Sequence, residues 1–263
     1  MDRKLYYFSG AGNDFVVVDG REGDVSEFRD VARIQALCKE YGTDGLMILG
    51  LGDASVDFTM EFYNPDGSGG MMCGNGGRCI VAFADYLGIR PASGGVFLFM
   101  APDGLHTGEI LARPEDGLWE VRIKMIDVQG ITPMLGGYFL DTGTRHFVKF
   151  VPDVEQVDIN TEGKTLRWDP AFAPVGTNVN FVHVAPDGLH VRTFEKGVEG
   201  ETLACGTGLT ASAIAAYAAS VVPESSVRLR ARRDWLSVNF TPGADEKFTD
   251  VYLTGPARLV EIL

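Results

Sequence analysis

Residues 59–79 read TMEFYNPDGSGGMMCGNGGRC, and residues 191–211 read VRTFEKGVEGETLACGTGLTA. A shift of 132 positions lays Cys73 on Cys205 and aligns the glycines that follow each cysteine. In both stretches a strand-like run precedes the cysteine, and a glycine-rich helix start follows it. This pair of stretches indicates that one structural unit occurs twice in the chain.

The same shift of 132 positions also aligns other stretches of the two halves. It places the hairpin-like stretch 96–111 over 227–242, and the strand-like run 118–125 over 250–257. The shift is close to half of the 263 residues. Coincidence of common strand and helix patterns is the alternative, and it is disfavoured because one shift aligns the whole chain. We therefore expect an N-terminal half, 1–126, and a C-terminal half, 127–263, whose last strands can return to the first half.

Each half is predicted to be rich in strands with one central helix. The helix after Cys205 carries no charge on any side, and a helix that is apolar or small all round is buried all round. A further amphipathic helix is expected at about 28–41, with Val31, Ile34, Leu37 and Cys38 on one face. The expected class is α/β (α+β): two pseudo-symmetric halves, each a curved, mostly antiparallel sheet around a central helix. Strands are expected at 5–8, 14–19, 46–49, 56–63, 96–100, 138–141, 146–151, 179–184, 189–195, 227–231 and 235–240.

Charge and composition exclude several classes of function. The formal net charge of −13 disfavours binding to a nucleic-acid backbone. The uncharged stretch 203–223 is rich in Gly, Ala, Ser and Thr, so we interpret it as a buried helix and not a membrane span. Four cysteines without a CxxC pair, and four scattered histidines, predict neither a disulfide framework nor a structural zinc site. A reducing cytoplasm is the expected location.

Cys73 and Cys205 each open a helix. The first amides of a helix have no acceptor within it, and their partial positive charge favours an anion and lowers the pKa of a thiol. Two such thiols, one on each side of a bound carbon, suit removal of a proton from one face and delivery to the other. The natural reaction is inversion of an amino-acid α-carbon. Neither a cofactor motif nor a metal cluster is present in the sequence, and Cys38 and Cys79 are interpreted as buried core residues.

These stretches resemble the diaminopimelate epimerases. The likeness starts at GAGNDFVVVDG (10–20), continues through YNPDGSGGMMCGNGGRC (63–79), and returns at GTNVNFV (176–182) and RTFEKGVEGETLACGTG (192–208). It implies a cofactor-independent isomerase that interconverts LL- and meso-diaminopimelate in lysine and peptidoglycan biosynthesis. It also implies two pseudo-symmetric domains, one catalytic cysteine from each, and a homodimer.

The resemblance also implies roles for single residues. Cys73 and Cys205 would be the two acid/base groups, and His146 would lie near the cysteines and tune their pKa values. Glu195 would accept from the substrate amine, while Lys196 would meet the distal carboxylate. The remaining residues expected to bind the substrate are Asn13, Asn64, Gly74, Asn75, Asn178, Gly206 and Thr207.

The sequence departs from the family pattern at DTGTRHFV (141–148), where the family usually has Gly-Asn-Pro-His. Thr144 can donate one hydrogen bond but presents no amide, and Arg145 replaces a rigid proline. Lys196 stands where an arginine is usual, which keeps the charge and loses the bidentate fork. Three alternatives stay open: an epimerase of another amino acid, a non-catalytic binder of a small ligand, and a redox sensor in which the two cysteines form a disulfide.

Overall fold

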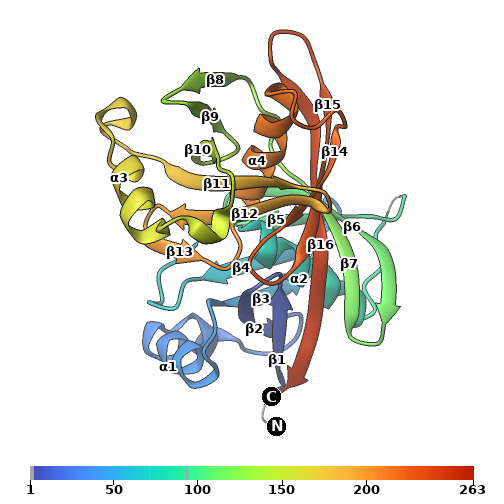
Figure 1. The fold of residues 1–263 in the computed structure, drawn as a ribbon. Coiled ribbons are helices and arrows are strands. Elements are labelled where there is room, and N and C mark those ends of the chain that lie inside the picture. Colours follow the sequence, from blue (N-terminus) through green and yellow to red (C-terminus); the bar gives the residue numbers. More distant parts are fainter. Residues whose placement is uncertain (1–2, 71, 93) are drawn as a thin grey trace. The chain divides into compact units, whose positions relative to one another are not determined.

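The computed structural model describes residues 3–70, 72–92 and 94–263 (Figure 1). The chain divides into two compact units. Unit 1 comprises Met1–Ile123 together with Gly255–Leu263, and unit 2 comprises Lys124–Thr254. The last nine residues therefore belong to the unit in which the chain begins.

In unit 1 the strands form a sheet that closes on itself. They follow one another in the order β1-β2-β3-β4-β5-β6-β7-β16, and β16 also pairs with β1. Neighbours are antiparallel except β2–β3 and β4–β5, which are parallel. Closure leaves no edge strand in this ring, which makes it a barrel. The strands are β1 (Leu5–Gly10), β2 (Asn13–Asp19), β3 (Gly45–Leu51), β4 (Phe58–Tyr63), β5 (Val96–Ala101), β6 (Gly104–Glu115), β7 (Leu118–Lys124) and β16 (Phe248–Ile262).

Unit 2 repeats this topology. Its order is β16-β15-β14-β12-β11-β10-β9-β8, with the short β13 beside β12, and its parallel pairs are β10–β11 and β12–β14. These pairs match β2–β3 and β4–β5 of unit 1, so the repeat inferred from the sequence is confirmed. The strands are β8 (Ile131–Met134), β9 (Gly137–Asp141), β10 (Arg145–Phe150), β11 (Asn178–Ala185), β12 (Gly188–Glu195), β13 (Gly200–Thr202), β14 (Ser226–Arg230) and β15 (Trp235–Pro242).

Each unit holds one helix against the inner face of its strands. Helix α2 (Gly74–Tyr86) contacts β1, β2, β3 and β6, and helix α4 (Gly206–Ala218) contacts β9, β10, β11, β12, β14 and β15. Gly206 and every residue from Gly208 to Ala216 are buried, so α4 is enclosed on all sides as predicted. Its buried hydroxyls are satisfied within the helix, because Thr210 donates to the carbonyl of Gly206 and Ser212 to that of Gly208. The expected fold class is confirmed.

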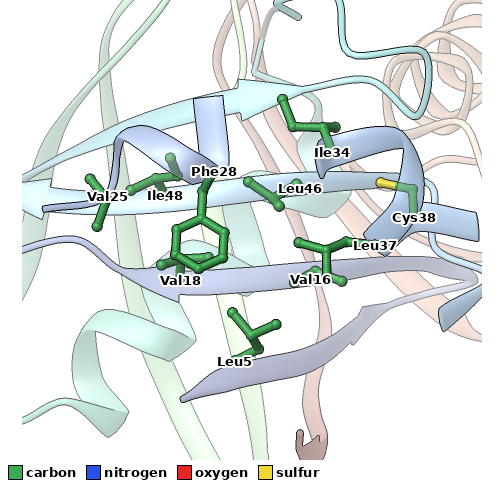
Figure 2. Packing of buried hydrophobic residues seen from close by; sticks show 10 residues of the cluster. All are labelled: Leu5, Val16, Val18, Val25, Phe28, Ile34, Leu37, Cys38, Leu46 and Ile48. Carbon is green, nitrogen blue, oxygen red and sulfur yellow. The ribbon is translucent and has the colours of Figure 1, made fainter. Parts of the chain in front are cut away.

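A second layer covers the outer face of β1, β2 and β3 in unit 1. Figure 2 shows its core, in which Phe28 and Ile34 pack against Val16, Val18 and Ile48. Residues of β2 are buried on both faces of the sheet, which accounts for the continuous apolar run in this strand. Unit 2 has a corresponding layer, in which α3 (Lys164–Arg167) and the short helical turns η2 (Val154–Gln156), η3 (Ile159–Gly163) and η4 (Pro170–Phe172) provide the covering residues.

The amphipathic helix expected at 28–41 starts later than predicted. A 3-10 turn, η1 (Ser26–Arg29), is followed by Asp30 in extended conformation, and only then by α1 (Val31–Tyr41). Asp30 caps α1 by accepting from the backbone N–H of Arg33. Ile34, Leu37 and Cys38 face the core as expected, but Val31 is 51% exposed, so its assignment to the buried face is wrong.

In the part of the chain that the structure describes, no helix has the length and apolar character needed to cross a membrane. The stretch 203–223 forms the buried helix α4 and the turns that flank it.

One buried and one exposed position of α1, Ile34 and Val31, provide a test of this layer. Ile34 is fully buried, so Ile34→Ala is expected to lower the free energy of unfolding by about 2–5 kcal/mol through lost burial and a cavity. Val31→Ala, at the exposed position of the same helix, is expected to change it by less than about 0.5 kcal/mol. Urea denaturation followed by circular dichroism measures both. Equal losses in the two variants would contradict the packing described for α1.

Candidate active site

Cys73 is the N-cap residue of α2. Its backbone is extended, and its Sγ accepts from the backbone N–H of Gly76 at 3.2 Å. The sulfur therefore lies where the first helix amides concentrate partial positive charge, and that charge favours the thiolate over the thiol. Cys73 is half-buried, unlike the core cysteines described below.

Cys205 occupies the matching position at the start of α4. It is the N-cap residue, again with extended backbone, and it is 8% exposed. Its Sγ lies 3.4 Å from Oγ1 of Thr207. Thr142 donates to the carbonyl of Thr207 at 2.9 Å, which ties the first turn of α4 to the end of β9. The two cysteines thus share a place in the repeat but have different polar partners.

Cys38 and Cys79 are core residues, as expected. Cys79 is fully buried inside α2, and burial raises the pKa of its thiol far above the ordinary value. Burial also raises the pKa of the Cys38 thiol, which faces the outer core under α1. Both thiols stay protonated at neutral pH, so neither is suited to accept a proton.

In unit 1 a buried arginine aligns two of the predicted binding residues. Arg78 is fully buried, and its guanidinium donates to Oδ1 of Asn75 at 2.8 Å and to the carbonyl of Gly74 at 3.2 Å. An arginine can only donate, so Asn75 must turn its amide nitrogen the other way, and that nitrogen donates to Oδ1 of Asn13. Asn13 consequently keeps its own amide hydrogens for a further acceptor. Sequence reasoning did not identify Arg78, although a single charge within the run of small and apolar residues 76–84 was a usable signal.

Asn64 takes part in a turn. Its carbonyl accepts from the N–H of Gly67, its N–H donates to the carbonyl of Ser68, and its side chain donates to Oγ of Ser68 at 3.0 Å. These bonds account for an asparagine before Pro65-Asp66-Gly67 by local geometry. A substrate contact by Asn64 stays a prediction.

In unit 2 His146 lies at the centre of a buried polar cluster. It sits on β10 with no exposed surface, and its Nε2 lies 2.9 Å from Oγ1 of Thr144 and 3.0 Å from Oγ1 of Thr207. Its Nδ1 lies 3.1 Å from Nδ2 of Asn180. Burial lowers the pKa of His146 to about 3, and the positive charge of Lys196 acts in the same direction. The imidazole is therefore neutral at physiological pH.

Asn178 pairs with His146 across β10 and β11 and closes the same cluster. Its Nδ2 donates to the carbonyl of Arg145 at 2.9 Å and to Oγ1 of Thr144 at 3.1 Å, while its Oδ1 accepts from the N–H of Lys196 at 2.8 Å. Both hydrogens of this amide are thus used within the protein, and only its oxygen has capacity for a further bond.

Glu195 and Lys196 lie at the end of β12, beside Asn178. Oε2 of Glu195 accepts from Oγ1 of Thr202 at 2.9 Å. Unit 2 therefore joins several predicted residues, Thr144, His146, Asn178, Lys196, Cys205 and Thr207, through direct hydrogen bonds or close polar contacts. Unit 1 gathers Asn13, Gly74 and Asn75 with Cys73 at the start of α2.

In the described ranges 3–70, 72–92 and 94–263, no group of three or more His, Cys, Asp or Glu side chains is arranged to hold a metal ion. Both cysteines instead sit among backbone amides at helix starts, an arrangement that suits a carboxylate.

The glycines three positions after each cysteine differ in the space around them. A Cβ at Gly208 would lie 2.3 Å from Oδ1 of Asn180, whereas a Cβ at Gly76 would lie 3.3 Å from the sulfurs of Cys73 and Met47. Alanine normally stabilises a helix by about 1 kcal/mol relative to glycine. We expect Gly208→Ala to destabilise the protein by about 1–3 kcal/mol, since its clash meets a held amide, and Gly76→Ala to be neutral or stabilising. Urea denaturation of both variants tests this, and equal effects would contradict it.

The depressed pKa of His146 predicts a pH dependence of stability. Below pH 6.5 the unfolded chain binds a proton on this imidazole that the folded protein does not bind until about pH 3. Unfolding therefore takes up a proton in this window, and stability falls with falling pH by up to about 1.4 kcal/mol per pH unit. Denaturation between pH 6.5 and 5 should show a steeper loss in wild type than in His146→Gln. Parallel curves would contradict a buried, neutral His146.

Solved structures with little sequence likeness share the fold. A phenazine biosynthesis protein of the PhzF family from Bacillus anthracis superposes with a TM-score of 0.77 at 12% identity, over 100% of this chain and 99% of that chain. A hydroxyproline epimerase from Agrobacterium vitis superposes with a TM-score of 0.66 at 16% identity, over 99% of this chain and 91% of that chain.

Sequence comparison is more specific. The family model described as diaminopimelate epimerase matches residues 6–93 and 138–260. A diaminopimelate epimerase from Chlorobaculum tepidum is 40% identical, covering 96% of this chain and 97% of that protein. One from Flavobacterium psychrophilum is 38% identical, covering 98% of each. The chain belongs to the diaminopimelate epimerase family.

Proposed function

We propose that the protein is an amino-acid epimerase that interconverts LL- and meso-diaminopimelate without a cofactor, in lysine and peptidoglycan biosynthesis. The observation that carries the proposal is the equivalence of Cys73 and Cys205, each the N-cap residue of the central helix of its own unit. Relatives that carry this name cover nearly the whole chain.

The chemistry needs one sulfur on each face of the α-carbon. A thiolate takes the α-proton, so an S–H bond forms as the C–H bond breaks, and the electron pair is delocalised toward the carboxylate. The thiol on the opposite face then gives its proton to the carbon and becomes a thiolate. The substrate is inverted, and the two sulfurs exchange protonation states. The reverse reaction uses them in the opposite roles.

The backbone at the two helix starts would stabilise the negative charge that develops. Gly74 and Asn75, and likewise Gly206 and Thr207, are the first residues of α2 and α4, where amides lack acceptors within the helix. Donors held in place before the reaction do not have to reorganise when charge moves to the carboxylate. Asn13, whose amide hydrogens are kept available by Asn75, would add another donor.

The remaining polar residues would recognise the rest of the substrate. Glu195 would accept from an ammonium group, and Lys196 would attract the distal carboxylate. The oxygen of Asn178 has capacity to accept from the same ammonium, while Asn64 would add a contact from its turn. The proposal includes a homodimer located in the cytoplasm, and its mass in solution can be measured by light scattering.

Deuterium exchange tests the proposal directly. Reduced protein is mixed with LL-diaminopimelate in D2O, and deuterium at the α-carbon is followed by NMR. Wild type should exchange, and Cys73→Ser and Cys205→Ser should each be slower by a factor of about 10²–10⁴, because a serine hydroxyl is a far weaker acid than a thiol and is not ionised near neutral pH. Cys38→Ala is the matched control, since its thiol lies in the outer core; its exchange rate should equal that of wild type.

The outcomes separate the candidate functions. Absence of exchange in folded, reduced wild type would refute the proposal for this substrate. Thr144, Arg145 and Lys196 differ from the usual family residues, and these differences favour one second candidate, an epimerase of another amino acid. That candidate predicts exchange with a basic or cyclic amino acid instead. A non-catalytic binder predicts binding without exchange and no loss of binding on replacing either cysteine.

A further inference from the structure

Behind Cys205 runs a line of buried side chains that the proposed function does not use. Asn180 on β11 and Thr193 on β12 are cross-strand neighbours, and both are buried. Asn180 reaches His146, His146 reaches Thr207, and Thr207 reaches the sulfur of Cys205. Because each of these groups can donate or accept, the direction of the hydrogen bonds decides whether the sulfur of Cys205 accepts a hydrogen bond from Thr207.

The orientation of the Asn180 amide follows from its partners. The carbonyl oxygen of Phe147 can only accept, and it lies 3.2 Å from Nδ2 of Asn180. On the other side, Oδ1 of Asn180 accepts from the hydroxyl of Thr193 at 2.9 Å. The amide nitrogen is therefore the group that faces Nδ1 of His146 at 3.1 Å.

This orientation determines the tautomer of His146. Since Asn180 donates to Nδ1, that nitrogen must present its lone pair, and the single proton of the neutral ring lies on Nε2. Nε2–H faces the hydroxyls of Thr207 and Thr144 at 3.0 and 2.9 Å. Neither hydroxyl can donate to a protonated nitrogen, so the hydrogen of Thr207 is directed to its other neighbour, Sγ of Cys205 at 3.4 Å.

We propose that Asn180 is a positioning residue: it holds His146 in the Nε2–H tautomer, so that Thr207 donates a hydrogen bond to the sulfur of Cys205. The opposite tautomer would draw the hydrogen of Thr207 to Nε2, and the sulfur would lose a donor. A hydrogen bond donated to a thiolate stabilises it relative to the thiol. His146 acts here as a donor and not as a proton acceptor. The inference rests on the proposed function only in giving Cys205 an acid/base role.

The backbone of α4 is shaped for this contact. A Cβ at Gly208 would lie 2.3 Å from Oδ1 of Asn180 and 3.3 Å from Oγ1 of Thr193, so a side chain there would displace the pair. A Cβ at the matching position in α2, Gly76, would lie 3.3 Å from the sulfurs of Met47 and Cys73 and 3.7 Å from the methyl group of Met60. The repeat therefore places polar, directional neighbours beside Gly208 and methionine side chains beside Gly76.

The tautomer is measured by NMR of protein labelled with 15N-histidine, at pH 7. His146 is assigned as the signal lost in His146→Gln. In wild type we expect Nδ1 to be unprotonated and Nε2 protonated. In Asn180→Asp, which keeps the shape but can only accept from the ring, Nδ1 should become protonated. Asn239→Leu, which removes an asparagine that bonds Ser226 elsewhere in unit 2, is the control and should leave the His146 signals unchanged.

The effect on sulfur is measured by alkylation of Cys205 with iodoacetamide across pH, in a Cys73→Ser background with peptide mapping. We expect Asn180→Leu and Thr207→Val each to move the midpoint of the profile up by about one pH unit, the effect of losing one donor to a thiolate. The double variant should move it no further, because both changes break the same line of bonds. Circular dichroism and the histidine spectra establish that each variant is folded.

A protonated Nδ1 in wild type, an unchanged tautomer in Asn180→Asp, or additive shifts in the double variant would each overturn the inference. None of these measurements uses diaminopimelate, so they give a result whether or not the protein epimerises it. A failure of deuterium exchange together with the expected tautomer would leave Asn180 as a positioning residue for Cys205 in another reaction.

Discussion

The buried helix at the centre of each unit is the constraint on which the structure depends. A helix enclosed by strands can bury its apolar and small side chains, but its first amides still need acceptors. In α2 the sulfur of Cys73 accepts one of them from Gly76. The arrangement that provides an acceptor for a buried helix start therefore also places the ionisable sulfur of Cys73 among hydrogen-bond donors. Burial of the helix and the placement of the thiol among hydrogen-bond donors have one physical origin.

The repeat supplies two such helix starts, and the differences between them are chemical. In unit 1 the first turn of α2, which Cys73 caps, has Met47 beside Gly76 and the amide of Asn75 oriented by the buried Arg78. Unit 2 places the hydroxyl of Thr207 beside Cys205, and the neutral His146 contacts that hydroxyl and the hydroxyl of Thr144. The two-base epimerisation that we propose would use one thiolate and one thiol in each direction, and it would therefore require two sulfurs whose proton affinities differ only modestly. Unlike surroundings on a common backbone provide a means to set that difference.

Sequence reasoning anticipated the parts of the structure that depend on periodicity and repetition. Matching Cys73 with Cys205 predicted the two units, and the uncharged circumference of α4 predicted its enclosure. The start of α1 was misplaced because Asp30 both ends a turn and caps a helix, which a pattern of apolar residues does not register. Arg78 and Asn180 were missed for another reason, because each acts through the orientation of a side-chain amide. Arg78 orients the amide of Asn75, and Asn180 presents its own amide to His146. Asn180 lies on the same face of β11 as Asn178, so the alternation of residues along the strand offered a signal. The orientation of its side-chain amide, however, is set by the carbonyl of Phe147 and the hydroxyl of Thr193, which lie on other strands.

The same network bears on Thr144, where the resemblance leads one to expect asparagine. Thr144 accepts from Nδ2 of Asn178 at 3.1 Å and faces Nε2–H of His146 at 2.9 Å. With both of these partners donating, its own hydroxyl hydrogen must point away from them. Thr144 is therefore a hydrogen-bond donor with a defined direction. The amide nitrogen of an asparagine at this position would also be a donor. Compared with an asparagine, Thr144 has a shorter reach and fewer hydrogens to donate, but it still donates, so a hydrogen-bond acceptor is the group that this position favours.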